Sequence, residues 1–382
     1  MTSESVVGTV PLIVLAGVRE EATDLASVAV ACSLPSPVVL RYRLDPEHET
    51  LYRSAAAVAG VIDEEQVPLA GGCLTCALRE DAVQILRRLA PREDCGAVVL
   101  RLPEAYPAAR LVGALAQRLA KGSMPGARVE PRAVVAAFSG GLLLEDIFGD
   151  ELLEELAPMR HRGDRRSVGE VLSAQVEYAD MLIDVDGPLG SDAQALLDEL
   201  RRPTSVVLDD LADLDAGPLI GEPHAVEEAT AFVDPANRSP RQPPAFPDEV
   251  VEVSAVPGTG VWTLFVDTWR PFHPARLLEQ LETVGGRGMR GRGCFWLPTR
   301  PDGYNVWDGA GAQLSIGPGA PWGDRRPRTR LVITGLGGDP YAVAEAVRSI
   351  LMTDAELVAG LPSWAGVPDG FDQWLGAQRD AA

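Results

Sequence analysis

Residues 69–81 read LAGGCLTCALRED, and two cysteines, Cys73 and Cys76, stand three positions apart within this stretch. A Gly-Gly pair precedes the cysteines, and a run with apolar residues at helical spacing follows over residues 78–89. Glycine allows the backbone to bend sharply, and the spacing of the run predicts an amphipathic helix. The sequence therefore places both thiols in a tight loop that opens a helix.

A thiol at the start of a helix is more acidic than an ordinary thiol. Free backbone N–H groups and the positive end of the helix dipole both favour thiolate there. Thiolate is the form that binds zinc or attacks a disulfide. The structural alternative is that Cys73 and Cys76 are two small apolar residues packed at a turn, since a CxxC without a second such pair is only moderately specific. We predict the functional role.

The composition is that of a soluble globular protein with an acidic surface. The 382 residues are enough for two domains, and 46% hydrophobic with 23% charged residues is ordinary for a globular chain. A net charge of −21 repels nucleic acid on average. The sequence predicts no signal peptide and no membrane span, and five cysteines, an odd number, favour a reducing compartment. We therefore expect a cytoplasmic protein without a membrane partner.

Short apolar strands alternate with helices over the first part of the chain. Strands are expected at residues 11–17, 38–42, 97–102, 133–138, 181–186 and 205–208. Helices besides the one after the CxxC loop are expected at residues 23–31, 54–60, 105–121 and 192–200. This alternation predicts an α/β fold with a mainly parallel sheet and helices on both faces.

The first strand–helix connection stands where nucleotide-binding βα units have their phosphate-binding loop. Residues 17–24 read GVREEATD, with one glycine, no lysine and two adjacent carboxylates where a triphosphate would lie. Gly17 and Thr23 keep a role in such a loop, as the flexible glycine and the magnesium-binding hydroxyl. Lys121 is the single lysine of the chain, so this loop lacks the ammonium that neutralises a terminal phosphate. We predict a degenerate nucleotide loop at Gly17 and Thr23 whose phosphate chemistry is lost.

A proline-rich segment, residues 222–248, separates a region of alternating strands and helices from a region in which strand-length segments follow one another. We interpret it as a linker between a first domain, residues 1–221, and a second domain, residues 249–382. Beyond the linker, strand-length segments follow one another, and helices are expected at residues 274–281 and 341–351. This pattern predicts a smaller α+β domain with antiparallel strands.

The second domain carries the clearest family signature. Residues 270–277, RPFHPARL, and residues 293–301, GCFWLPTRP, resemble the C-terminal domain of the CobW family. The later residues Trp307, Gly311 and Trp322 fit the same resemblance, which covers nearly the whole chain.

The CxxC loop is similar to a second motif of that family, GCxCC followed by Arg-x-Asp. Residues 72–76 match the first part, except that Thr75 replaces the middle cysteine. Arg79 and Asp81 match the second part. The resemblance implies a P-loop GTPase that acts as a metallochaperone, inserting zinc or cobalt into client metalloproteins or supporting cobalamin biosynthesis.

The chain departs from the family at its three GTP motifs. Residues 17–24 lack the phosphate-binding lysine, residues 102–106 lack the glycine of an ExxG segment, and residues 181–186 lack the Asn-Lys of NKxD. The resemblance therefore implies a P-loop-NTPase-like fold, while the residues argue against GTP hydrolysis and leave open whether the degenerate loop still holds GTP. We do not expect a GTPase enzyme.

The chain also resembles a divergent actinobacterial branch of the family found among zinc-starvation genes. Part of that branch is associated with recruiting a hibernation factor to ribosomes, which implies a ribosome-associated protein partner. Three basic islands, residues 160–166, 286–293 and 325–330, would then contact ribosomal RNA. On an acidic protein such islands more often pair with Asp and Glu of the same chain.

A zinc site takes four ligands, commonly Cys and His, and Cys73 and Cys76 supply two. The set would be completed by a client protein or by one of the nearby candidates Glu80, Asp81, His48 and Cys95. We predict a CobW-like zinc-binding protein that handles the metal or uses it to gate a protein interaction. Two alternatives stay open, namely a zinc-responsive ribosome-associated adaptor and a CxxC thiol oxidoreductase.

Other cysteines and one histidine are expected to have structural roles. We expect Cys32, Cys95 and Cys294 to pack as apolar residues, because each lies in or beside an apolar segment. We expect His273, which directly precedes a proline at a helix start, to cap that helix or pack against it.

Overall fold

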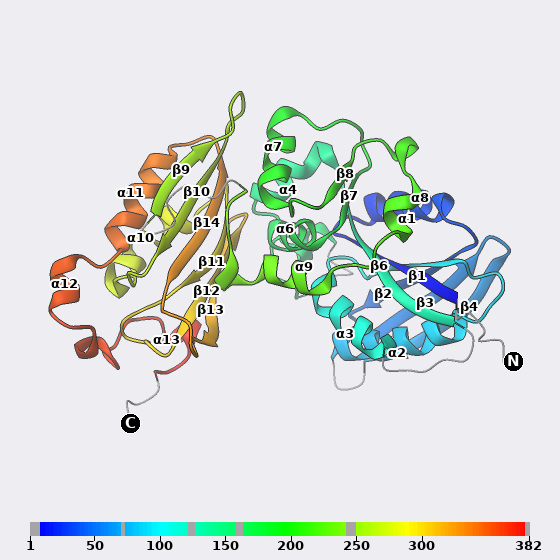
Figure 1. The fold of residues 1–382 in the computed structure, drawn as a ribbon, viewed down its shortest axis with the longest axis horizontal. Coiled ribbons are helices and arrows are strands. Elements are labelled where there is room, and N and C mark those ends of the chain that lie inside the picture. The colour runs from blue at the N-terminus through cyan, green and yellow to red at the C-terminus, as the bar shows by residue number, and fades with distance from the viewer. Residues whose placement is uncertain (1–7, 70–72, 121–126, 158–162, 242–249, 379–382) are drawn as a thin grey trace, which may run out of the picture. The chain divides into compact units, whose positions relative to one another are not determined.

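The chain forms two compact units, each built on its own sheet (Figure 1). The computed structural model describes residues 8–69, 73–120, 127–157, 163–241 and 250–378. The first unit comprises residues 1–143, 152–189 and 201–230. The second unit comprises residues 144–151, 190–200 and 231–382.

An eight-stranded sheet forms the first unit, in the order β4-β3-β2-β5-β1-β6-β7-β8. Its strands are β1 (Gly8–Gly17), β2 (Pro37–Asp45), β3 (Thr50–Ala57), β4 (Gly60–Pro68), β5 (Ala97–Arg101), β6 (Ala127–Phe138), β7 (Met181–Asp184) and β8 (Val206–Leu208). From β2 to β8 all neighbours in the sheet are parallel, whereas β3 and β4 extend it as an antiparallel hairpin. The predicted mainly parallel sheet is confirmed.

Helices cover both faces of this sheet. They are α1 (Glu20–Ser33), α2 (Leu74–Leu89), α3 (Ala108–Ala120), α5 (Leu153–Leu156), α6 (Val168–Tyr178), α8 (Ala216–Ile220) and α9 (Val226–Val233). Helices α1 and α8 lie on one side of the sheet, and α2 and α3 lie on the other (Figure 1). On the α1 side, Ile13 and Leu15 of β1 share a buried cluster with Val30 of α1 and Leu219 of α8. The expected α/β class is thereby confirmed.

The β3–β4 hairpin corrects one expectation. The sequence predicts a helix over residues 54–60, and this prediction is wrong, because β3 runs to Ala57 and β4 begins at Gly60. The alanines of this segment favour helix by intrinsic propensity. Pairing with β2 overrides that preference, because alternate residues of β3, namely Leu51, Arg53 and Ala55, are buried on one face.

A six-stranded antiparallel sheet forms the second unit, in the order β13-β12-β11-β14-β10-β9. Its strands are β9 (Val250–Ala255), β10 (Val261–Thr268), β11 (Met289–Phe295), β12 (Gly303–Ala310), β13 (Gln313–Pro321) and β14 (Thr329–Leu336). The helices grouped with it are α4 (Leu143–Phe148), α7 (Ser191–Leu200), α10 (Pro274–Gly285), α11 (Pro340–Ile350), α12 (Asp354–Val358) and α13 (Asp372–Leu375). The predicted α+β character is confirmed.

The RPFHPARL motif marks the start of α10. The His273 ring accepts a hydrogen bond from the backbone N–H of Arg276 at 3.4 Å, and Pro274 occupies the first turn. Phe272 stacks on Phe295 in the core, with their ring centroids 5.5 Å apart. The expected capping role of His273 is confirmed, and this motif builds the core of the second unit.

Two of the three cysteines outside the CxxC loop are buried as expected. Cys95 and Cys294 have relative exposures of 6% and 1%. Cys32 is exposed, so its expected burial is wrong. Its position on α1 turns it away from the sheet, whereas Val30 on the same helix turns inward.

The segment predicted as a linker contains regular structure. Helix α9 and the short helix η4 (Pro235–Asn237) lie within it, and residues 242–249 are outside the described residues. The predicted domain boundaries at residues 221 and 249 stay a prediction. Among the helices of the described residues, none combines the length and the hydropathy that a membrane crossing requires.

Candidate metal centre

The two CxxC thiols lie at the first turn of α2. Cys73 is the N-cap residue of that helix, and its Sγ accepts a hydrogen bond from the backbone N–H of Cys76 at 3.3 Å. Both cysteines are half-buried and neither forms a disulfide. The expected loop–helix arrangement is confirmed, with both sulfurs accessible at the positive end of a 16-residue helix.

The thiols are electrostatically unequal. A hydrogen bond with the Cys76 side chain, aided by the Cys76 N–H and the charge of Arg79, lowers the pKa of Cys73. The same thiol–thiol hydrogen bond raises the pKa of Cys76, and the charge of Glu80 adds to that increase. Cys73 is therefore the sulfur that first presents a lone pair to a metal ion or to another reactant.

A hydroxyl pair lies beside the thiols. Tyr106 donates its hydroxyl proton to Thr75 Oγ1 at 3.1 Å, which links the CxxC loop to the segment that precedes α3. Thr75 stands where the family motif has its middle cysteine. A threonine oxygen is a poor substitute for a thiolate as a zinc ligand. Through its hydrogen bond with Tyr106, Thr75 instead holds the CxxC loop against the segment that precedes α3.

His48 and Cys95, two of the candidate further ligands, are poorly suited to complete a site at the thiols. No three His, Cys, Asp or Glu side chains gather into a metal-binding group anywhere in the described part of the chain. His48 is paired with Asp45 at 3.0 Å in the turn between β2 and β3. Burial raises the pKa of Cys95 to about 11, which disfavours the ligating thiolate.

Glu80 and Asp81 follow the thiols on α2, but they differ in environment. The Glu80 side chain is exposed and lies 3.8 Å from the Arg79 guanidinium. Asp81 is mostly buried and accepts hydrogen bonds from Tyr42 and Arg53. Glu80 is thus open to solvent near Cys76, whereas Asp81 is engaged in a different cluster.

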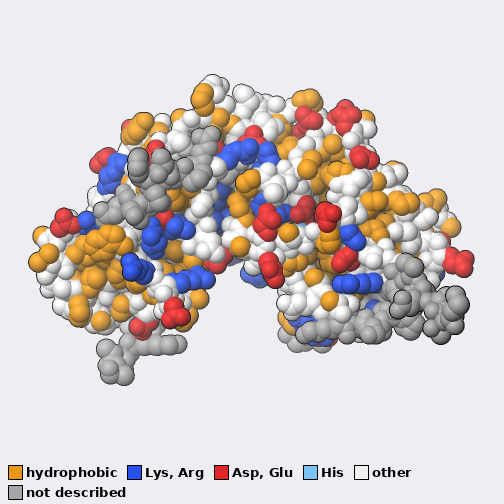
Figure 2. Space-filling model, in the orientation of Figure 1, with side chains coloured by type: hydrophobic (Ala, Val, Ile, Leu, Met, Phe, Trp, Pro, Cys, Tyr) orange, Lys and Arg blue, Asp and Glu red, His pale blue; other side chains and the backbone are white. Residues whose placement is uncertain are grey.

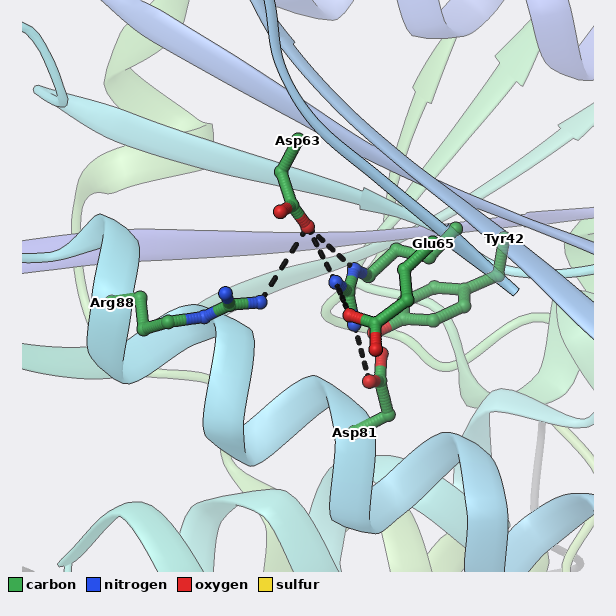
Figure 3. Close-up of polar contacts among 6 residues, drawn as sticks. Tyr42, Asp63, Glu65, Asp81 and Arg88 are labelled. Carbon is green, nitrogen blue, oxygen red and sulfur yellow. Dashed lines mark hydrogen bonds and ion pairs between the residues drawn. The ribbon is translucent and has the colours of Figure 1, made fainter. Parts of the chain in front are cut away.

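That second cluster surrounds the buried side chain of Arg53, and Figure 3 labels its other members Tyr42, Asp63, Glu65 and Asp81. Arg53 of β3 forms ion pairs with Asp63 and Glu65 of β4 and with Asp81 of α2. Tyr42 of β2 donates its hydroxyl proton to Asp81 Oδ2 at 2.5 Å. We call these five residues the Arg53 cluster.

The Arg53 cluster joins the hairpin to the helix that carries the thiols. Burial lowers the pKa of Arg53, but hydrogen bonds with Asp81, Asp63 and Glu65 raise it by more. Burial and the adjacent Asp81 carboxylate raise the pKa of Tyr42, so its hydroxyl stays protonated as a donor. Asp81 lies one and a half turns beyond Cys76 on α2, and its fixation therefore limits how the first turns of the helix can move.

The two residues predicted for a nucleotide loop are in contact with each other. Strand β1 ends at Gly17 and α1 begins at Glu20, so the connection is short. The Thr23 hydroxyl, which is buried, donates to the carbonyl of Arg19 at 2.7 Å. A Cβ atom on Gly17 would lie 2.1 Å from Thr23 Oγ1. A role of Gly17 and Thr23 in cofactor binding stays a prediction.

Arginines of the basic islands pair within the chain. Arg290 is buried against Asp308, and Arg330 pairs with Asp267. Acidic side chains lie among the arginines on the face drawn in Figure 2. Residues 160–162 of the first island are outside the described residues. These pairings favour the intramolecular role of the islands over contact with ribosomal RNA.

Comparison with known proteins points to one family. Residues 261–351 match the family described as the cobalamin synthesis protein cobW C-terminal domain. The zinc chaperone Rv0106 of Mycobacterium tuberculosis (strain H37Rv) is 25% identical over 402 residues, covering 95% of this chain and 93% of the relative. The protein Mb0109 of Mycobacterium bovis matches with the same identity and coverage.

A solved structure also matches this chain. The Zn(II)-bound YjiA GTPase from E. coli is 14% identical and covers 90% of this chain and 99% of its own. The TM-score of this match is 0.36.

Proposed function

We propose that the chain is a CobW-family protein that binds zinc at Cys73 and Cys76 and hands the metal to a client metalloprotein. The observation that carries the proposal is the thiol pair at the start of α2. The name of the mycobacterial zinc chaperone, a relative that spans almost the whole chain, supports the choice of metal.

The donor set suits a metal that is held for transfer. Zinc prefers four ligands in a tetrahedron, and thiolate sulfur is among the ligands that it binds best. Two thiols leave two positions for solvent, for Glu80 or for donors of a client. An incoming client can then exchange ligands one at a time, without first breaking a closed four-ligand site.

Zinc titration tests the proposal. We compare the wild-type chain with the Cys73→Ser/Cys76→Ser variant, using a competing chelator to measure affinity. Loss of both sulfurs should weaken binding by roughly a hundredfold or more, which corresponds to about 2.8 kcal/mol. The Cys32→Ser variant is the matched control, because Cys32 is an exposed cysteine outside the loop. Equal affinity of all three proteins would exclude a zinc site at the thiol pair.

The proposal includes no turnover of GTP. The connection from β1 to α1 contains only Val18 and Arg19 between its flanking elements, and Thr23 donates its hydroxyl within α1. The single lysine of the chain lies outside this connection. A phosphate-release assay with magnesium and GTP should give only background.

The inequality of the thiols favours a second candidate function, thiol–disulfide exchange. A dithiol in which one thiol has a lowered pKa and its neighbour a raised pKa resembles the attacking and resolving pair of an oxidoreductase. An insulin-reduction assay tests this function. Only background reduction by wild-type protein would remove it.

A further inference from the structure

Two arginines stand side by side on the α1 face of the first sheet. Arg41 of β2 and Arg101 of β5 are register partners, and Leu15 of β1 is the next residue in the same row. Residues that pair in register point to the same face of a sheet. Leu15 belongs to the cluster that packs against α1, so both guanidinium groups lie on the side where α1 begins.

Carboxylates of the first two turns of α1 reach these arginines. Glu20 Oε1 lies 2.8 Å from Arg41 Nη2, and Asp24 Oδ1 lies 2.8 Å from Arg101 Nη2. Asp24 also approaches Arg41 at 3.6 Å. Glu20 and Asp24 are four positions apart and therefore project from the same side of the helix. One side of α1 thus supplies two anions to two adjacent cations.

Arg101 has an environment that requires such anions. Its side chain is 1% exposed, and Glu104 Oε1 lies 3.0 Å from its Nη1. The Nε of Arg101 is buried and has no hydrogen-bond partner among the described residues. A buried guanidinium without paired anions is strongly unfavourable. The carboxylates therefore pair with the arginine by charge, whereas both its Nε and its Nη2 make no hydrogen bond within the described residues.

The network lies beside the corner where nucleotide-binding βα units hold phosphate. The N-terminus of the helix after the first strand combines a positive dipole with free N–H groups, and this corner binds the phosphates of nucleotides in βα units. Here α1 has Glu20 in its first turn, and a cavity of about 630 Å³ lined by Glu20, Arg41 and Arg43 opens beside it. The cavity is also lined by Glu64 and Glu65, and through it a small anion can reach Arg41 from solvent.

We propose that Glu20 and Asp24 are internal anions that fill a phosphate-type anion site formed by Arg41 and Arg101. These ion pairs connect α1 to β2 and β5, and no bound nucleotide is needed for that connection. The same corner regains affinity for an inorganic phosphate species once the two carboxylates are neutralised. The ordinary alternative, a set of structural ion pairs with no anion site, predicts no gain of binding.

Pyrophosphate is the probe that separates these alternatives. We titrate it into the full chain by calorimetry, at ionic strength matched with chloride, for wild type and for Glu20→Gln/Asp24→Asn. Wild type should show no saturable binding, and the double variant should bind roughly tenfold or more tightly than any residual wild-type binding. Adding Arg41→Gln to the double variant should abolish the gained binding.

Controls keep each outcome decisive. Asp369→Asn removes a carboxylate from a comparable arginine pair, Arg300–Asp369, in the second unit and should gain no pyrophosphate binding. If the double variant fails to fold, Asp24→Asn alone serves, because the Asp24 side chain is 42% exposed. Wild-type binding as tight as that of the variant would overturn the proposal. So would a folded variant that does not bind.

This result is independent of the zinc proposal. Zinc titration of the same variants should give the wild-type affinity, because the thiols lie on α2, on the opposite side of the sheet from α1 (Figure 1). Failure of the anion test with normal zinc binding therefore refutes only the filled anion site.

Discussion

Replacing Arg53 by methionine should destabilise the first unit and loosen the proposed zinc site at Cys73 and Cys76. The Arg53 side chain is 1% exposed and holds three carboxylates from two elements. Methionine keeps much of the apolar stem but leaves Asp63, Glu65 and Asp81 facing one another without a cation. Removing one partner of a buried ion pair costs about 3–5 kcal/mol.

The lower end of that range applies here, because solvent reaches part of the cluster. Glu65 is 55% exposed and Asp63 is 24% exposed, whereas Asp81 is only 12% exposed. We therefore expect a loss of about 3 kcal/mol in the free energy of unfolding of this unit. For a unit of this size that loss lowers Tm by roughly 6–12 °C. Zinc affinity should fall by about tenfold, since α2 loses its tie to the hairpin.

Chemical denaturation, followed by circular dichroism, measures the stability, and a chelator competition measures the zinc affinity. Arg88→Met is the matched control, because Arg88 is 57% exposed and contacts Asp63 at 3.5 Å. An exposed pair of this kind contributes at most about 1 kcal/mol. If Arg53→Met loses no more stability than Arg88→Met, the claim that the Arg53 cluster holds α2 is refuted.

Alkylation of the native protein by iodoacetamide should modify Cys73 before Cys95 and Cys294. Burial raises the pKa of Cys95 to about 11 and of Cys294 to about 12, so mass spectrometry should find these two labelled only after unfolding, and early labelling of either would contradict the assignment. Burial raises the pKa of Asp369, but its arginine partner and other hydrogen-bond donors lower it to about 2. Its stabilising effect should therefore be complete above about pH 4, the unfolded value, and lost as pH falls through about 2, and Asp369→Asn should flatten this dependence in acid-unfolding curves. Gly335→Ala should cost about 1–3 kcal/mol in urea unfolding, because its Cβ would lie 2.3 Å from a tryptophan ring of β10, and an unchanged midpoint would argue against that packing.

The parallel core and the thiol-bearing helix could be predicted because their signals are local. Buried parallel strands have continuous apolar runs, and β1 and β5 are of this kind. The Gly-Gly pair before Cys73 and the apolar spacing after it indicate a loop followed by a helix. The α10 cap could be predicted from His273 and Pro274 for the same reason.

The Arg53 cluster could not be predicted because its signals are not local. Its members come from β2, β3, β4 and α2, and the intervening hairpin was itself predicted as part of a helix. The available signal was Arg53 at a buried position of a strand with alternating burial. That signal can be used only once residues 50–57 are recognised as a strand. Asp81 was considered as a metal ligand, although its carboxylate is engaged by Arg53 and Tyr42.

The carboxylates of the first loop illustrate a second limit. Sequence reasoning treated Glu20 as a group that repels phosphate, which follows from its charge alone. It could not show that Arg41, from the next strand, and Arg101, from a strand much later in the chain, both meet that helix start. The ion pairs of these two arginines with Glu20 and Asp24 now occupy the region beside the degenerate nucleotide loop.

Native mass spectrometry of freshly purified protein tests the central claim most directly. The account predicts one zinc ion per chain in the wild type, no bound guanine nucleotide, and loss of the metal from the Cys73→Ser/Cys76→Ser variant. Zinc retained by that variant, or GTP bound to the wild type, would contradict it.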